Sequence, residues 1–388
     1  MLRGAATAAV AYLGRMPGQH ATTPLRANSW RDPQLYVPPV ALVVLAGAWG
    51  RHPHGIALIA VIGVLVAAVL SSVHHAEVIA HRVGEPFGTL ILALAVTVIE
   101  GGLIVTLMAS HPESSQALAR DTVFAAVMIV CNGVVGLCLV VGALRHRVVA
   151  FRAEGTSGAF AALLTLCVLS LVLPTFTTST PGPTFSGPQL TFAAVGSLVL
   201  YVVFVLTQTV QHREYFLPVE TPSTSSAAAP EPADHGDATA AVRSAVLLPF
   251  GLIAVVGLAK TLSPAIEDGV EAIDAPNSLV GVVIALVVLL PETIAAVRAA
   301  TRNRLQTSMN LALGSGLASI GLTIPTIAVA SIWLDGPVVL GLDGKEIVLL
   351  TVTAAVGILT LVHGQAIVLQ GAIHLVIFGA FLVLAVRP

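Results

Sequence analysis

The sequence predicts an all-α polytopic membrane protein with about eleven transmembrane helices: two inverted five-helix repeats plus an extra N-terminal helix. Three observations predict this class. Of the 388 residues, 56% are hydrophobic and only 10% are charged, whereas roughly 25% of a soluble domain is charged. Many apolar runs approach the roughly 20 residues that a bilayer-spanning helix needs. One glutamate recurs inside an apolar run in each half of the chain.

Eleven apolar runs, bounded by glycine, proline or charged residues, are predicted to form the helices. They cover residues 37–50, 55–73, 87–110, 120–144, 157–174, 190–211, 243–262, 277–299, 305–331, 346–362 and 365–386. The first run is short for a spanning helix, which takes about 17–25 residues.

The basic residues predict the orientation of these helices. With the N-terminus in the cytoplasm, thirteen of the eighteen Lys and Arg residues lie on the cytoplasmic side, four in the tail and nine beyond it. Membrane proteins carry such an excess in their cytoplasmic loops. The opposite side is acidic, with one predicted loop holding Glu267, Asp268, Glu271 and Asp274. This loop either concentrates cations at a mouth or is an ordinary solvated loop.

Composition divides the chain into five segments. Residues 1–36 form a basic cytoplasmic tail, and 37–54 hold the extra first helix. Residues 55–212 form the first five-helix repeat, 213–242 an acidic, Pro- and Ser-rich flexible cytoplasmic linker, and 243–388 the second repeat. An odd number of helices in each half forces the two halves into opposite orientations, as in the inverted repeats of many secondary transporters.

Two glutamates carry the expected chemistry. Glu100 lies within the apolar span 90–108 and Glu292 within 278–297, each on the second helix of its half. An ionised side chain at the bilayer centre costs roughly 2.5–3.5 kcal/mol on insertion scales. Two facing carboxylates in a low dielectric cannot both stay ionised without a cation between them, and Ca²⁺ prefers oxygen ligands. Protons and cation therefore compete for the same oxygens, which is the basis of an antiport mechanism.

Residues beside each glutamate are expected to support the site. Pro291 removes a helix hydrogen bond and is expected to free the carbonyl of Val287. The hydroxyls of Thr97 and Thr293 either add oxygen ligands or bond back to their own helix. Gly101 and Gly102 either loosen the helix after Glu100 or permit close packing.

The helix that follows each glutamate is polar at its centre. These residues are Asn132 in the first half and Asn310, Ser315 and Ser319 in the second. An intramembrane asparagine acts either as a ligand or as a hydrogen-bonding link between helices.

Histidines form a second, separate group of candidates. His74, His75, Glu77 and His81 lie at the cytoplasmic end of one helix. Glu77 and His81 are one turn apart, so they form either a zinc or proton-sensing site or an ordinary interfacial cluster. His374 in the last helix is expected to be a hydrogen-bonded packing residue.

Three motifs give the chain a family resemblance. GEPFGTLILALAVTVIE (84–100), CNGVVGLCLVVG (131–142) and LPETIAAVRAATRNRLQTSMNLALGSGLASIGLTIP (290–325) resemble the calcium/cation exchanger superfamily. They are most similar to its bacterial ChaA-type calcium/proton and sodium-potassium/proton antiporters. The resemblance implies one essential glutamate on the second helix of each repeat, at Glu100 and Glu292. It also implies an integral protein of the bacterial cytoplasmic (inner) membrane.

The chain departs from the superfamily pattern beside both glutamates. The residues before them read VTVIE and LLPE, where a GNAxE-like run is usual, and Asn132 stands where serine is usual. Fewer carboxamide oxygens near the site suggest a weaker preference for Ca²⁺ and more tolerance of Na⁺ or K⁺.

The expected function is a secondary cation/proton antiporter that exports Ca²⁺, and by this reasoning Na⁺ or K⁺, from the cytoplasm by alternating access. Its expected partners are the lipid bilayer, the transported cations and protons, with no resident cofactor and no nucleic acid. The alternative is a cation channel with an acidic midplane site, whose flux would move no protons. An intramembrane enzyme is not expected, because the chain offers no HExxH pattern, no intramembrane Asp pair and no Ser–His constellation. The sequence also has no P-loop, so ATP is not expected to drive the protein directly.

Overall fold

The structure is a computed structural model that describes residues 33–51, 53–84, 87–110, 116–219, 238–333 and 336–388. Most of the predicted basic tail over 1–36 lies outside the described residues. So do residues 220–237 of the predicted linker over 213–242.

The first half of the chain contains helices α2 to α9. Their bounds are α2 (Val37–Ala48), α3 (Ile56–Val83), α4 (Phe87–Ser110), α5 (Leu118–Met128), α6 (Val135–His146), α7 (Ala153–Cys167), α8 (Leu173–Phe176) and α9 (Gly187–Leu206). Three π-helical segments, Ile129–Val134, Val168–Val172 and Thr207–Gln211, continue α5 into α6, α7 into α8, and the end of α9. Single-turn 3₁₀ helices cover Pro33–Leu35 and Arg213–Phe216.

The second half contains helices α10 to α15. Their bounds are α10 (Ala238–Ala272), α11 (Ser278–Val288), α12 (Leu290–Thr301), α13 (Leu305–Ala330), α14 (Gly344–Leu361) and α15 (Val368–Val386). Two short strands, β1 (Val149–Ala150) and β2 (Gln365–Ala366), pair antiparallel.

The described residues confirm an all-α polytopic membrane fold. Within the part of the chain that the structure describes, nine helices are long and apolar enough to span a bilayer, and a tenth span is formed if α11 and α12, which meet at a bend of 53°, count as one. The eleventh predicted span corresponds to α2, whose 12 residues fall short of the roughly 17–25 that a spanning helix takes. The count of eleven therefore remains a prediction.

One predicted loop is wrong. Glu267, Asp268 and Glu271 were expected in a loop after the helix over 243–262, but they lie on the last turns of α10, which runs for 35 residues. Only Asp274 follows the helix, with a positive φ of 54°. Hydropathy ends a predicted span at the first charges, whereas a helix continues into water when good helix formers follow.

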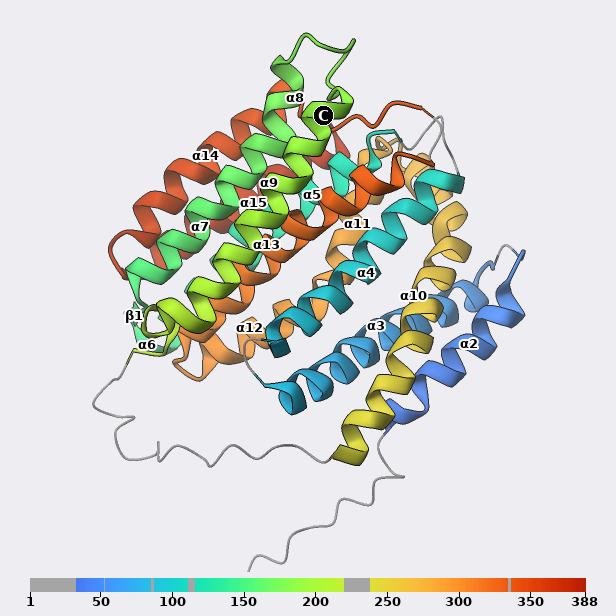
Figure 1. Cartoon of the computed structure of the whole chain (residues 1–388), viewed down its shortest axis with the longest axis horizontal. Helices are drawn as coiled ribbons and strands as arrows, with labels where there is room; N and C mark the ends of the chain where they lie inside the picture. Colours follow the sequence, from blue (N-terminus) through green and yellow to red (C-terminus); the bar gives the residue numbers. More distant parts are fainter. Residues whose placement is uncertain (1–32, 52, 85–86, 111–115, 220–237, 334–335) are drawn as a thin grey trace, which may run out of the picture.

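The helices of the two halves contact one another in a matched way. The first helices of the halves, α3 and α10, pack together, α4 packs on α13, and α11 packs on α5. Likewise α9 packs on α13 and α15 packs on α6. Two repeats related by a pseudo-two-fold axis in the membrane plane would make this pattern of contacts. In Figure 1, α2, α3 and α10 form a group beside α4, while α7, α9, α14 and α15 lie on the other side of α13.

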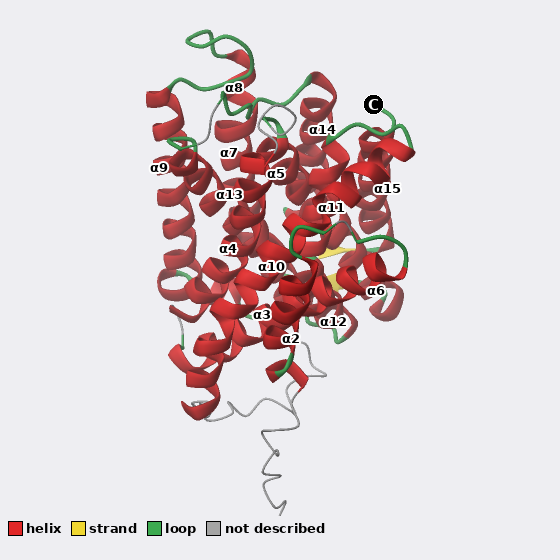
Figure 2. Cartoon of the chain, turned by 90° about the vertical axis from the view of Figure 1, so that its right-hand side faces the viewer, coloured by secondary structure: helices red, strands yellow, loops and turns green. Residues whose placement is uncertain are grey.

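Loops from both halves meet at each end of the bundle. At one end β1, after α6, pairs with β2, after α14, and the two strands are visible in Figure 2. At the other end, an isolated bridge joins Thr184, between α8 and α9, to Val339, between α13 and α14. If the spanning helices alternate in direction, the two loops of each contact lie at the same end of the bundle, which agrees with both pairings.

Candidate cation-binding site

Glu100 is buried in the middle of α4, a helix that runs without a break from Phe87 to Ser110. Only 2% of its surface is exposed. The hydroxyl of Ser319 on α13 donates a hydrogen bond to Glu100 Oε1 at 2.6 Å. A hydrogen bond of this length to a carboxylate is a strong one, so α13 holds the Glu100 side chain in place.

Glycines after Glu100 let neighbouring helices approach α4 closely. A Cβ at Gly101 would lie 3.1 Å from Thr326 Cγ2 on α13, and one at Gly102 would lie 3.0 Å from Val256 Cγ2 on α10. Because α4 stays helical through both positions, the structure supports close packing rather than a loosened helix.

Glu292 lies in a different local structure. The helix breaks at Leu289, and Pro291 and Glu292 both fall in the first turn of α12. The unpaired N–H groups and the dipole of a helix N-terminus favour negative charge. The bend of 53° therefore creates a helix start at Glu292, inside a predicted span. Pro291 suits this position because its missing N–H is not needed in the first turn.

Two predicted supporting groups beside Glu292 are not free. The carbonyl of Val287, expected to be released by Pro291, accepts a backbone N–H where α11 ends. Helix ends commonly satisfy such carbonyls by tightening their last turn. The hydroxyl of Thr293 donates to the carbonyl of Leu289 at 2.7 Å. Both oxygens still have a lone pair, so their expected role as cation ligands stays a prediction.

Two buried oxygens near the glutamates remain unpaired. Glu292 Oε2 and the hydroxyl of Thr97 have no hydrogen-bond partner within the described residues, whereas the buried hydroxyl of Thr323 lies beside Glu100 and interacts with its carboxyl group. Thr97 is three residues before Glu100 and Thr323 is four after Ser319, so each lies on the same helix face as its neighbour. Glu100 and Glu292 themselves interact electrostatically. Carboxylate and hydroxyl oxygens of this kind suit a hard cation.

A cavity of about 650 Å³ reaches Glu292. Glu292, Ser315 and Asn310 line it, and so do Glu77 and His81 from the end of α3. Glu77 and His81 are exposed. The cavity therefore extends from the end of the bundle where α3 ends and α13 begins, inward to Glu292. Arg82, Arg298, Arg302 and Arg304 lie on these same helix ends and connections, so we call this end of the molecule the arginine-rich end.

The predicted asparagines serve to link elements to one another. Asn132 Nδ2 donates to Thr353 Oγ1 on α14 at 2.9 Å, and Asn132 Oδ1 accepts from His374 Nδ1 on α15 at 3.1 Å. The other ring nitrogen of His374 accepts from the hydroxyl of Thr360 at 3.2 Å. His374 is therefore a satisfied packing residue, as predicted.

Asn310 is also occupied by protein partners. It accepts from Gln306 Nε2 at 2.8 Å and donates to the carbonyl of Phe216 at 2.7 Å. Of the predicted supporting residues, Ser319 reaches a glutamate, Thr97 is unpaired within the described residues, and Ser315 lines the cavity.

The histidine cluster divides into two parts. His75 is buried and bonds to Ser244 Oγ at 3.0 Å and to the carbonyl of Gln34 at 3.2 Å, which joins α3 to α10 and to the segment before α2. Glu77 and His81 instead line the cavity. No three His, Cys, Asp or Glu side chains of the described residues are grouped so that they could hold a metal ion. The zinc alternative for the cluster therefore lacks support.

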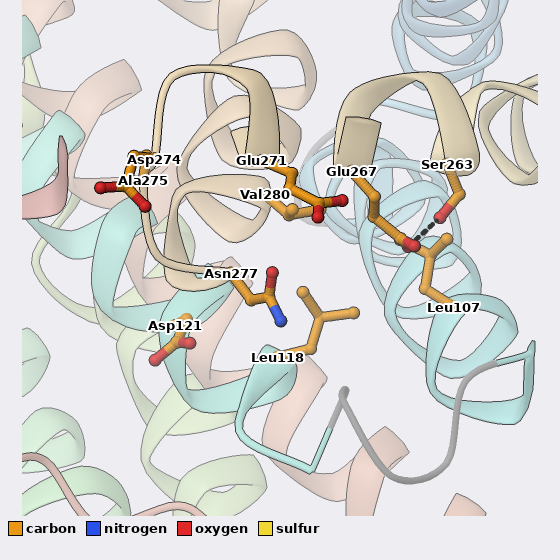
Figure 3. Close-up of a pocket in the computed structure, with 10 residues that line it drawn as sticks. All are labelled: Leu107, Leu118, Asp121, Ser263, Glu267, Glu271, Asp274, Ala275, Asn277 and Val280. Carbon is orange, nitrogen blue, oxygen red and sulfur yellow. Dashed lines mark hydrogen bonds between the residues drawn. The ribbon is translucent and has the colours of Figure 1, made fainter. Parts of the chain in front are cut away.

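A second cavity, of about 370 Å³, lies at the opposite end of the bundle. Figure 3 shows Glu267 and Glu271 of α10 lining it together with Asn277, Leu107 and Leu118. Ser263 donates to Glu267 at 2.8 Å. Among the described residues that line this cavity there is neither Glu100 nor Glu292, so of these two cavities the one at the arginine-rich end reaches Glu292.

Comparison with known proteins identifies the family of this chain. The model of the sodium/calcium exchanger protein family matches residues 54–210 and 243–387. The chain belongs to the sodium/calcium exchanger family. It is thus an integral membrane protein and a secondary transporter rather than an enzyme, as the sequence predicted.

Two individual relatives support the same assignment. This chain is 49% identical over 326 residues to the "Putative ionic transporter y4hA" of Sinorhizobium fredii, and the match covers 84% of this chain and 87% of the relative. It is 34% identical over 359 residues to the sodium-potassium/proton antiporter ChaA of Escherichia coli, covering 91% and 95%. These identities confirm the predicted resemblance to ChaA-type antiporters.

Solved structures share the fold of the exchanger. The structure of native YfkE matches with a TM-score of 0.66 and 17% identity, over 91% of this chain and 98% of that one. The H⁺/Ca²⁺ exchanger CAX matches with a TM-score of 0.65 and 17% identity, over 90% and 86%.

Proposed function

We propose that this exchanger exports Ca²⁺ from the cytoplasm in return for protons, by alternating access, with Glu100 and Glu292 binding cation and protons in turn. The observation that carries the proposal is the buried, unpaired Oε2 of Glu292 at the inner end of a cavity of about 650 Å³. A carboxylate there is reachable from one end of the molecule and electrostatically linked to Glu100.

The basic residues indicate the side from which the cation reaches Glu292 in this conformation. The cavity opens at the arginine-rich end, which is cytoplasmic by the excess of basic residues. The cation therefore reaches Glu292 from the cytoplasm. Two protons for each Ca²⁺ is the smallest ratio if only these two carboxyls exchange.

The oxygen set supports Na⁺ and K⁺ as further cargo. The two predicted carboxamides, Asn132 and Asn310, are held by other protein groups. Two carboxylates and a few hydroxyls remain, whereas Ca²⁺ usually takes about six to eight oxygen ligands. A relative with 34% identity is named a sodium-potassium/proton antiporter, which agrees with a site of low selectivity.

Reconstitution tests this proposal. Purified protein in liposomes with an imposed pH gradient should take up Ca²⁺, and a pH-sensitive dye should report protons moving in the opposite direction. Glu100→Gln and Glu292→Gln should each abolish both fluxes, because glutamine can neither release a proton nor neutralise a cation. Glu154→Gln, an exposed carboxylate at the start of α7, is the matched control and should exchange normally.

The same assay separates the antiporter from a cation channel. A channel would pass the cation down its gradient without proton movement. Exchange retained in both glutamine variants, at wild-type expression and elution behaviour, would reject the mechanism.

A further inference from the structure

Glu77 has no role in the two-glutamate mechanism, although it lies in the same cavity as Glu292. It lies near the end of α3, seven residues before Gly84, where the helix stops. The side chain is exposed, and no Lys, Arg or His nitrogen of the described residues forms an ion pair with it. A carboxylate at this place faces the water that fills the mouth of a cavity.

The polar groups around Glu77 are two histidines, four neutral side chains and one further carboxyl group. On α3 itself, Glu77 interacts electrostatically with His74 and His81. Across the cavity, the polar lining residues of α13 and of the π-helical segment that ends α9 are neutral: Gln208, Thr307, Asn310 and Ser315. The other charged group that faces it is Glu292 of α12, with which it interacts electrostatically. Two carboxylates thus share one aqueous path, at its mouth and at its inner end.

We propose that Glu77, with His81 one turn further along α3, forms an entry site that captures the cation from the arginine-rich end and passes it to Glu292. The proposal rests on the proposed function and adds a second, weaker binding site to it. Carboxylate oxygen and water suit Ca²⁺, while the low-dielectric walls of a cavity focus the field of a single charge on the path inward.

An entry site matters here because basic residues lie at the end of the bundle where the cation enters. Arg298, Arg302 and Arg304 lie at the end of α12 and between α12 and α13, and their charges repel a cation. A carboxylate at the mouth offsets that repulsion along the path that the cation takes. It acts on capture from this side alone, because the other cavity, at the opposite end, is lined by different residues.

Sidedness is therefore the test. In inside-out membrane vesicles the cytoplasmic face meets the external solution, so the half-saturating external Ca²⁺ concentration measures capture at this end. Glu77→Gln should raise it about tenfold, the lower end of the effect of electrostatic focusing, while the maximal rate stays near that of the wild type. In right-side-out vesicles, the half-saturating Ca²⁺ concentration should not change.

Two further measurements make the result specific. Glu77→Asp keeps the charge and should restore capture, whereas Glu154→Gln, exposed at the same end but not among the residues lining the cavity, should behave as wild type. Added choline chloride should raise the half-saturating concentration of the wild type toward that of Glu77→Gln, since exposed charges are screened over about 8 Å at physiological ionic strength.

The outcomes separate the two proposals. If Glu292→Gln abolishes exchange while Glu77→Gln matches wild type on both sides, the entry site is rejected and the antiporter stands. If Glu77→Gln changes both sides equally, the residue supports the fold and the entry site is again rejected. If Glu292→Gln exchanges normally, the antiporter mechanism itself fails. Should Glu77→Gln express poorly, the choline titration of the wild type decides alone: no effect of choline rejects the entry site.

Discussion

The crossing of α6 and α15 offers the sharpest test of the packing. A Cβ at Gly371 would lie 2.7 Å from Val140 N and 2.8 Å from the carbonyl oxygen of Gly136. Both are backbone atoms of a helix, so neither can turn aside. In Gly371→Ala, α15 must move away from α6 by about 0.7 Å to restore an ordinary contact of 3.4 Å.

That movement also weakens the buried hydrogen bonds. The bond of 3.1 Å between His374 and Asn132 would lengthen past the roughly 3.5 Å at which such a bond is lost. Overpacking costs about 1–3 kcal/mol, and a lost hydrogen bond about 0.5–1.5 kcal/mol. Together these predict that Gly371→Ala has a free energy of unfolding about 1.5–4.5 kcal/mol lower than that of a Gly→Ala variant of the same helix that causes no clash.

Gly379 supplies the control for this measurement. It lies two turns further along α15, and a Cβ there would meet nothing within 4 Å. Gly379→Ala therefore has the same effect on helix propensity without the clash. Unfolding of both variants in mixed micelles should differ by the predicted amount. Equal stabilities would show that α15 does not pack on α6 as described.

Three further substitutions test the polar contacts. Asn132→Leu leaves Nδ1 of His374 without its partner and should destabilise the protein by about 1–3 kcal/mol, while the half-saturating Ca²⁺ concentration in proteoliposomes stays constant. A large change in that concentration would make Asn132 a ligand after all. Ser319→Ala removes the hydrogen bond to Glu100 and should raise the half-saturating Ca²⁺ concentration for uptake at least tenfold, as a loss of about 1.5–3 kcal/mol in binding implies. An unchanged half-saturating concentration would count against α13 as part of the site. Arg120→Met removes the ion pair that Arg120 forms with Asp121 at 2.8 Å. Because both side chains are partly exposed, the free energy of unfolding should fall by about 1 kcal/mol, and high salt should reduce this loss. A loss that salt does not affect would point to packing instead.

Much of the fold could be predicted because hydropathy reports membrane spans directly. The predicted run over 87–110 has the bounds of α4, and 305–331 differs from α13 by one residue. Pro291 marked a disturbed helix, and the helix breaks two residues before it, at Leu289. Glu100 and Glu292 stood out because charge at membrane depth is costly, a property of the residue and its span alone.

The partners of the polar residues could not be predicted in the same way. The partners depend on how each helix is rotated about its axis. Hydropathy does not reveal this rotation, because lipid tails are as apolar as the helix interfaces. Asn132 shows the difficulty: it lies in the π-helical segment Ile129–Val134, whose wider turn changes which face later residues occupy. Thr323 was missed, although its spacing of four from Ser319 placed both on one face. The cavity that joins Glu77 to Glu292 required three-dimensional contacts among α3, α9, α12 and α13.

The break before Glu292 has a consequence for how such a chain can be built. Only Glu292 lies at a helix start, whereas Glu100 lies inside a continuous helix and depends on a serine from another helix. Two identical subunits related by a two-fold axis would have to present the same surroundings at both carboxylates. Joining the halves in one polypeptide removes that requirement. Duplicating either half to make a symmetric dimer would therefore yield two bent helices or none, and neither assembly would reproduce the unequal pair found in the single chain.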